Sequence, residues 1–231
     1  VRGELGTLED KALALAQVWR ERSKSVQESF DSLEPVLALR EAMLRILHRE
    51  SPGPVTRHLV LRHLLDISES ARRVGQHSIA QGALHRFLQV SRTEVGAAAG
   101  GMLATRAEER VFEGLRRQLA EARVFWGRGE TDSAVRVARA AATRLKRLLE
   151  EGVGEGPPGG DERWREKQLL LSEALRLTGG WMAKTRSESS REILSSYLNP
   201  AVEAALAGAE PHGTTPTLAG VLGERRAAEE A

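Results

Sequence analysis

Apolar side chains recur every three or four residues along most of the chain, which is the spacing of one face of an α-helix. The clearest case is the stretch from about Leu103 to Trp126, which is followed by Gly127 and Gly129. Its apolar positions are spaced by three, four, three and four residues: Phe112, Leu115, Leu119, Ala122 and Trp126. No convincing alternation of period two, which would indicate a half-buried strand, is present. The pattern therefore predicts an all-α protein of about nine helices joined mostly by short connections.

The first part of the chain is predicted to form four helices. They run from Thr7 to Val26, from Asp31 or Ser32 to the Ser51-Pro52-Gly53-Pro54 run, from about Thr56 to Gly75, and from His77 or Ser78 to about Val90. Gly75 can adopt the left-handed conformation that ends a helix. The inner faces are expected to carry Leu8, Ala12, Leu15 and Trp19; then Val36, Leu39, Met43 and Ile46; then Leu61, Leu64, Leu65, Ser68 and Ala71; and finally Ile79, Ala80, Ala83, Leu84 and Phe87.

The later part of the chain continues the helical pattern. Asp132 is the expected N-cap of a helix with Val135, Ala138, Ala142, Leu145 and Leu149 inward, and a helix from about Asp161 carries Leu170, Ala174, Leu177 and Trp181. Gly179 and Gly180 lie inside that last pattern, where each glycine costs about 1 kcal/mol relative to alanine, so close packing of a neighbouring helix is expected to compensate. A capping box of Ser189 and Glu192 opens a short helix bearing Ile193, Leu194, Tyr197 and Leu198, and Asn199-Pro200 is expected to cap a further turn or two through Leu206.

Glycine-rich stretches suggest how the chain is divided. We expect residues 1–152 to be the first part of a helical-repeat segment, 153–160 a Gly/Pro linker, 161–207 its continuation, and 208–231 a loop and a frayed terminal helix. Within the first part, Gly96 to Gly101 is predicted to be a small-residue connector.

A glycine between two helices anchors an internal repeat. Ala71, Gly75, Ala80 and Phe87 share their offsets with Phe125, Gly129, Ala134 and Ala141, and these are the offsets of a tetratricopeptide-like unit. We therefore predict antiparallel helix hairpins stacked as a tetratricopeptide-like α-solenoid, with an unrelated α-hairpin as the alternative. The residues expected to be structural packing anchors are Trp126, Trp181, Phe87, Gly129 and Ala134.

Composition and charge narrow the class of protein. Hydrophobic residues make up 41% and charged residues 29% of the chain, which is globular composition, and no cysteine is present for disulfides or thiolate metal ligands. No apolar stretch approaches the roughly 18–20 residues that span a bilayer, so we expect a soluble intracellular chain without a membrane partner. The first residue is Val1, which indicates a fragment or a processed chain. The formal net charge is only +2 with acids and bases interleaved, so direct nucleic-acid binding is not expected.

No catalytic, cofactor or metal motif stands out. The glycine-rich segment from Gly152 to Gly160 lacks the Gly-Lys-Ser/Thr ending of a phosphate loop. The six histidines never form a His-Glu-x-x-His pair, and no serine lies in a nucleophile elbow. Carboxylates alternate with arginines at helical spacing and are interpreted as surface ion pairs. Of the tryptophans, Trp19, Trp126 and Trp181 lie on apolar stripes, which favours core packing over base stacking, and Trp164 is ambiguous.

Three stretches, in collinear order, resemble the FAT domain of the ataxia-telangiectasia mutated (ATM) family of phosphatidylinositol-kinase-related serine/threonine kinases. The first is Leu-Glu-Pro-Val-Leu-Ala-Leu-Arg-Glu at residues 33–41, and the second is Gln-Leu-Ala-Glu-Ala-Arg-Val-Phe-Trp at 118–126, with Ala134 beyond. The third and most specific is the run from Leu175 to Glu188, which contains Gly-Trp-Met-Ala-Lys-Thr and resembles the family's Gly-x-Trp-x-Ala-x-Thr segment. It continues with Ile193, Tyr197-Leu198 and Pro200-Ala201-Val202.

The resemblance implies a non-catalytic scaffold in the nucleus. In the intact kinase such a solenoid contacts the kinase domain and neighbouring helical repeats, contributes to homodimer contacts and takes part in regulation of the DNA-damage response. The His-Arg-Asp-like and Asp-Phe-Gly kinase signatures do not occur in these residues, so no activity, cofactor or ligand-contacting residue is carried over. The alternative functions are a free-standing helical-repeat adaptor that binds a protein partner, and an all-α enzyme, which would need convergent polar groups in a pocket.

Overall fold

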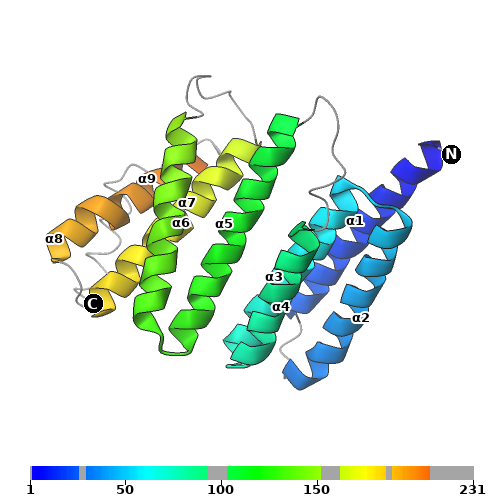
Figure 1. Ribbon diagram of the computed structural model, residues 1–231, viewed down its shortest axis with the longest axis horizontal. Coiled ribbons are helices and arrows are strands. Elements are labelled where there is room, and N and C mark those ends of the chain that lie inside the picture. Colours follow the sequence, from blue (N-terminus) through cyan, green and yellow to red (C-terminus); the bar gives the residue numbers. More distant parts are fainter. Residues whose placement is uncertain (1, 26–29, 93–102, 152–161, 186–188, 209–231) are drawn as a thin grey trace.

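The protein is built from α-helices laid side by side in antiparallel succession (Figure 1). The computed structural model describes residues 2–25, 30–92, 103–151, 162–185 and 189–208. Over these ranges no strand occurs, and each helix from α2 to α7 packs against the next along the chain. The first four helices are α1 (Arg2–Ser25), α2 (Phe30–Glu50), α3 (Pro54–Arg73) and α4 (His77–Arg92). The prediction of an all-α solenoid is confirmed.

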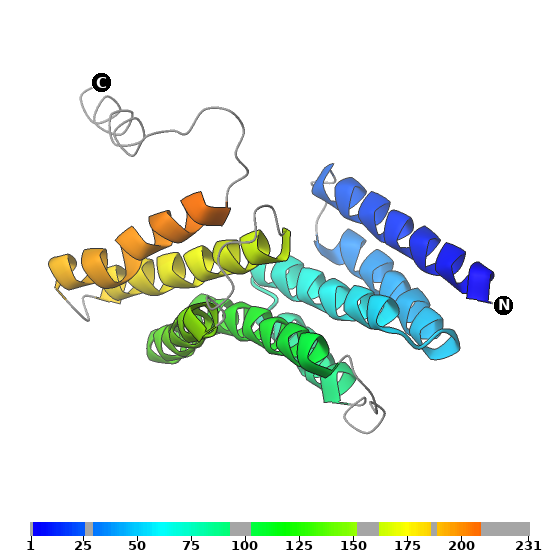
Figure 2. The same cartoon turned by 90° about the horizontal axis from the view of Figure 1, so that it is seen from above.

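The second half of the array contains two long antiparallel helices followed by a third with a shorter partner. They are α5 (Leu103–Gly127), α6 (Thr131–Glu151), α7 (Glu162–Thr185), α8 (Ser190–Ile193), the π-helical turn η2 (Leu194–Leu198) and α9 (Asn199–Gly208). Seen from above, α7 and α9 lie along one another (Figure 2). Helix α6 begins at Thr131, so Asp132 lies in its first turn and is not the N-cap that the sequence predicts.

Two glycines make equivalent turns in the two hairpins. Gly75 between α3 and α4, and Gly129 between α5 and α6, both adopt φ of +80°. In each turn the glycine N–H donates to the carbonyl three residues back, and the following N–H donates to the carbonyl five residues back at Ala71 or Phe125. Only glycine adopts this left-handed conformation without a steric penalty. Gly75 and Gly129, which align the two units of the predicted repeat, therefore occupy equivalent positions in the structure.

The predicted inner faces from α3 to α7 are confirmed. Buried side chains of α3 and α4 form one apolar cluster with α2, and those of α5, α6, α7 and α9 form the others. Alanines at the helix crossings are fully buried, which permits close approach of the two backbones: Ala71, Ala80, Ala83, Ala122, Ala134, Ala138 and Ala141. The core lies between the helices of each pair and between successive pairs.

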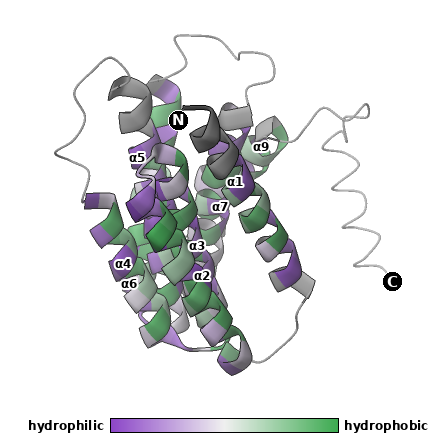
Figure 3. Ribbon diagram, turned by 90° about the vertical axis from the view of Figure 1, so that its right-hand side faces the viewer, coloured by the Kyte–Doolittle hydropathy of each residue, from purple (hydrophilic) through white to green (hydrophobic). Residues whose placement is uncertain are grey.

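The predicted inner face of α2 is wrong. Val36, Leu39, Met43 and Ile46 are all exposed, Leu39 by 62% and Ile46 by 53%, whereas Phe30, Leu37 and Leu44 are buried. The physical reason is that α2 carries two apolar stripes at helical spacing, and periodicity alone cannot say which one faces α3. Viewed from the end of the array that carries α1 and α2, hydrophobic positions recur along these helices (Figure 3).

Helix α1 makes a thin contact with the rest of the fold. Ala12 and Trp19 are partly buried against the apolar cluster of α2, α3 and α4, as predicted. Leu15 is 43% exposed, which contradicts the predicted stripe. The apolar contact is made by Ala12, Ala16 and Trp19. It is narrower than the apolar stripe that the sequence predicts. Leu8 and Val26 lie outside the described side chains and residues.

The two adjacent glycines of α7 differ in their surroundings. A Cβ atom on Gly179 would lie 2.9 Å from Tyr197 Cβ and 3.0 Å from Leu198 Cδ2, so the close helix packing expected there is confirmed. A Cβ atom on Gly180 would meet nothing within 4 Å, so the same expectation is wrong for Gly180. Its position on the helix turns it away from the neighbouring helix.

The further helix predicted after Tyr197-Leu198 is present as α9, but Asn199 does not cap it as predicted, because its φ of −65° and ψ of −49° are helical. The backbone N–H of Glu192 donates to Ser189 Oγ at 3.3 Å, which confirms the predicted cap. The chain then continues through η2, where Asn199 N–H donates to Leu194 O, directly into α9. The widened turn precedes Pro200, whose missing N–H removes one α-helical hydrogen bond at this point. The predicted connector at 96–101, the linker at 153–160 and the loop and terminal helix at 208–231 fall almost wholly outside the described residues.

Candidate functional site at the junctions between helix pairs

Two tryptophans stack where α5, α6 and α7 meet. Trp126 at the end of α5 and Trp181 in α7 have ring centroids 4.8 Å apart and planes inclined by 6°. Trp181 is 7% exposed, whereas Trp126 is partly buried. Fully buried Ala122, Ala134 and Ala138 belong to the same apolar cluster. Their small side chains leave room for the two indole rings between the helices.

Of the other residues predicted to be packing anchors, only Ala134 belongs to the cluster that holds this stack. Gly129 lies in the turn between α5 and α6. Phe87 of α4 is buried in a different cluster, formed by α2, α3 and α4 with Val124 of α5. The structure therefore brings Trp126, Trp181 and Ala134 together and places Phe87 at a different junction.

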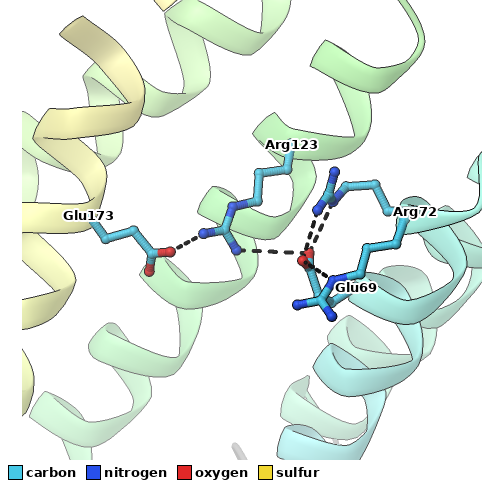
Figure 4. Close-up of polar contacts among 5 residues, drawn as sticks. Glu69, Arg72, Arg123 and Glu173 are labelled. Carbon is cyan, nitrogen blue, oxygen red and sulfur yellow. Dashed lines mark hydrogen bonds and ion pairs between the residues drawn. The ribbon is translucent and has the colours of Figure 1, made fainter. Parts of the chain in front are cut away.

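A chain of charged side chains joins three helices of the array (Figure 4). Glu69 of α3 accepts hydrogen bonds from Arg72 Nη2 at 2.8 Å and from Arg73 Nε at 3.1 Å. Arg123 of α5 lies with Nη1 3.9 Å from Glu69 Oε2, and its other terminal nitrogen donates to Glu173 of α7. This chain bridges the α3–α4 hairpin to the α5–α6 hairpin and then to α7.

The ionisation of these groups follows from their partial burial. Burial alone would raise the pKa of Glu69, but hydrogen bonds from Arg72 and Arg73 and the charge of Arg123 lower that pKa below its ordinary value. Burial lowers the pKa of Arg123, and the charge of Glu69 opposes this shift. The contacts join carboxylate oxygens to guanidinium nitrogens, so the chain acts as a set of charge-assisted hydrogen bonds.

A more deeply buried ion pair fastens α3 to α5. Arg57 Nη1 lies 3.0 Å from Glu113 Oε2, and the two side chains are only 8% and 11% exposed. His58 Nδ1 lies 3.6 Å from the other carboxylate oxygen, Oε1. Breaking a buried pair by removing one partner leaves a desolvated charge, so this contact specifies how the two hairpins dock.

Further polar contacts join other helices of the array. Arg86 of α4 reaches Glu41 of α2 with Nε 3.1 Å from Oε1, and Arg128, in the turn after α5, donates to Gln81 of α4 at 2.9 Å. A third pair, Arg116 with Glu166, joins α5 to α7. Pairs along one helix, which the spacing of carboxylates and arginines predicts, also occur, for example Arg117 with Glu121 at 3.0 Å in α5. The pairs between helices are a different class. In a pair between helices, the two partners are dozens of positions apart in the sequence, so spacing does not predict them. The one local signal is a charged residue next to an apolar stripe, such as Glu113 beside Phe112.

His48, His63 and His77 lie in three different parts of the fold, and each contacts a different partner. His63 is buried, and its Nε2 donates to Leu37 O at 2.9 Å, so this nitrogen carries the proton. His48 Nδ1 lies 3.1 Å from Thr56 Oγ1 at the α2–α3 turn, and the His77 ring packs where a Cβ on Gly127 would lie, 2.6 Å from His77 Cε1. Across the described ranges, no group of three or more His, Cys, Asp and Glu side chains is placed to hold a metal ion.

The junctions position the helices relative to one another through stacked rings, ion pairs and hydrogen bonds. Arg57, Arg86, Arg116 and Arg123 each pair with a carboxylate of another helix, and Trp126 stacks on Trp181. None of the helices in the described part of the chain combines the length and apolar composition that crossing a bilayer requires.

Comparison with known proteins identifies a domain family for most of the chain. The FAT domain family matches residues 5–203. The chain is 26% identical over 192 residues to the serine-protein kinase ATM of Sus scrofa, covering 81% of this chain and 5% of that kinase. It is 26% identical over 196 residues to the serine/threonine-protein kinase ATM of Arabidopsis thaliana, covering 85% of this chain and 4% of that kinase. The chain therefore spans only about one-twentieth of the length of these relatives.

Proposed function

Because this chain belongs to the FAT domain family, we propose that it is a non-catalytic helical scaffold segment of an ATM-like, DNA-damage-response serine/threonine kinase. In this proposal it acts in the nucleus and positions and regulates a kinase domain that lies elsewhere in the parent protein. Its own residues perform no chemistry. They hold a stack of helices in one fixed arrangement, against which a catalytic domain can be placed.

The observation that carries this proposal is the set of contacts between successive helix pairs. The Glu69–Arg123–Glu173 chain, the buried Arg57–Glu113 pair and the indole stack each join helices from different pairs. Side chains locked in this way resist bending at the junctions because interiors and buried ion pairs have few alternative arrangements. A stiff array transmits position over its whole length, as a scaffold requires.

The exposed apolar stripe of α2 supplies a surface for the neighbouring repeats of the parent protein. Val36, Leu39, Met43 and Ile46 lie on one side of this helix and are exposed. A solenoid buries such stripes by stacking one unit on the next, and the equivalent turns at Gly75 and Gly129 support a tetratricopeptide-like repeat of this kind. In the isolated chain, where those repeats are not present, the same stripe is the surface we propose for contacts between two copies.

The first test is to read the open reading frame that encodes this chain beyond the codon for Ala231. The proposal expects a kinase domain in the same frame. A frame that contains none would instead support the alternative, a free-standing helical-repeat adaptor that binds a protein partner.

The second test measures whether the stack controls catalysis in the full-length parent protein. Arg57→Met removes one partner of the buried pair, and Arg49→Met, at an exposed side chain of α2, is the matched control. We expect Arg57→Met to change the rate of peptide phosphorylation and its response to activation, with Arg49→Met resembling the parent. If limited proteolysis shows that Arg57→Met loosens this segment while phosphorylation is unchanged, the positional role is wrong.

A further inference from the structure

The outer face of α6 carries a shallow groove that the junctions described above do not use. The groove has a volume of about 640 Å³, and its lining includes Thr185 of α7. Its charged lining consists of Arg136, Arg139, Arg144 and Arg147, against a single carboxylate at Asp132. The lining therefore has an excess of positive charge, whereas the whole chain has a formal net charge of only +2.

Helical geometry explains why these arginines form one surface. Arg136 and Arg144 are eight residues apart, as are Arg139 and Arg147, so at about 100° per residue all four project from the same side of α6. Ala134, Ala138 and Ala141 project from the opposite side and are fully buried against the rest of the fold. All four arginine side chains are exposed, and the stripe from Arg136 to Arg147 is about 16 Å long at a rise of 1.5 Å per residue.

The groove also offers apolar contact between the charges. Val135 and Ala140 lie among its lining residues. A ligand that places carboxylates opposite the arginines and methylene groups against these side chains would match both parts of the surface. Arginine is suited to this task because its planar guanidinium can bind a carboxylate through two parallel hydrogen bonds.

We infer that this groove binds an acidic peptide segment of a partner polypeptide. Charge complementarity selects a polyanion, and two features favour a peptide over a nucleic acid. No lining residue is aromatic, so the groove has no platform on which bases could stack. The basic surface is a single helical stripe on a chain of nearly balanced charge, which is narrower than the electrostatic footprint of a nucleic-acid-binding domain.

The test measures binding of a fluorescein-labelled glutamate-rich peptide to this chain by fluorescence anisotropy at about 0.15 M salt. A peptide with glutamine at every glutamate position and a labelled oligothymidylate are measured in parallel. The groove variant is Arg136→Glu with Arg144→Glu, and the matched control is Arg49→Glu with Arg191→Glu, which makes the same charge change at exposed side chains of α2 and α8. Circular dichroism verifies that every variant keeps its helices.

We expect the glutamate-rich peptide to bind and the groove variant to weaken its affinity at least about tenfold, with the control variant within about twofold of the parent chain. The glutamine peptide is expected not to bind. If the groove variant and the control variant lose the same amount of affinity, the effect is due to net charge alone and the inference is overturned. Absence of binding by the glutamate-rich peptide, or tighter binding of oligothymidylate that is lost in the groove variant, would overturn it as well.

Discussion

Each indole of the α5–α7 stack contributes in proportion to its burial. Trp181 is 7% exposed and Trp126 is only partly buried, although the two rings stack on one another. We expect Trp181→Ala to lower the free energy of unfolding by about 3–5 kcal/mol, since it empties a large buried volume, and Trp126→Ala to lower it less. Urea denaturation followed by circular dichroism measures both. Losses under about 1 kcal/mol at both positions would show that the stack is not a packing anchor.

Adjacent glycines of α7 should respond oppositely to the same substitution. Gly179→Ala forces a methyl group to within 2.9 Å of Tyr197 Cβ, so we expect net destabilisation of about 1–2 kcal/mol from overpacking. Gly180→Ala meets no atom within 4 Å and restricts the unfolded chain, so we expect stabilisation of about 0.5–1 kcal/mol. Thermal and urea unfolding of the two variants measure the difference. Effects of the same sign would mean that η2 does not pack on Gly179 as described.

The buried imidazole of His63 makes stability sensitive to pH. Burial lowers the pKa of His63 below its ordinary value of 6.5, although the bond to Leu37 O and the charges of Asp66 and Glu41 oppose this shift and Arg40 adds to it. Because the folded pKa is the lower one, the unfolded chain binds the proton more readily. Stability therefore falls as the pH falls below about 6.5, with a slope of up to about 1.4 kcal/mol per pH unit until the folded pKa is reached.

Substituting glutamine for this histidine isolates its contribution. We expect His63→Gln to lose less stability than the parent chain between about pH 7.5 and pH 5, since the group that resists protonation is gone. His85→Gln, at an exposed side chain of α4, is the control and should keep the parent slope. Unfolding free energies measured across this range give the comparison. Parallel curves for His63→Gln and the parent would contradict the assigned role.

At the scale of elements, the buried Arg57–Glu113 pair should behave as a unit. We expect Arg57→Met or Glu113→Leu alone to cost about 3–5 kcal/mol because each leaves the other charge desolvated between α3 and α5. The double variant should cost less than either single variant, since apolar side chains of similar volume replace both charges. A double-mutant cycle by urea denaturation measures this coupling. Additive costs would show that the two side chains do not interact across the junction.

At the scale of the whole molecule, the exposed stripe of α2 should drive association of the isolated chain. Leu39 is 62% exposed on this stripe, and neighbouring Ala38 points to another side of the helix. We expect Leu39→Lys to weaken self-association about tenfold, because a charge then replaces an apolar contact, and Ala38→Lys to have little effect. Sedimentation equilibrium measures both. Equal effects of the two variants would exclude the stripe as the contact surface.

The repeating spacing of apolar residues was sufficient to predict the helices themselves. The periodicity of α3 to α7 specifies one buried face for each helix, and the glycines at 75 and 129 specify left-handed turns, because these are properties of a few consecutive residues. The Ser189 cap is local in the same sense. The resemblance of the stretch from Leu175 to Glu188 to the FAT domain likewise depends only on the order and type of consecutive residues. The match of the FAT domain family to residues 5–203 agrees with it.

Tertiary structure alone decided the contacts between elements. Helix α2 carries two apolar stripes of similar spacing, and only the position of α3 buries Leu37 rather than Leu39. The partners of Arg123 lie far away along the chain, at Glu69 and Glu173, and the opposite fates of Gly179 and Gly180 depend on where η2 crosses α7. Helix formation depends on interactions within one or two turns, whereas burial and ion pairing depend on which surfaces of distant helices meet.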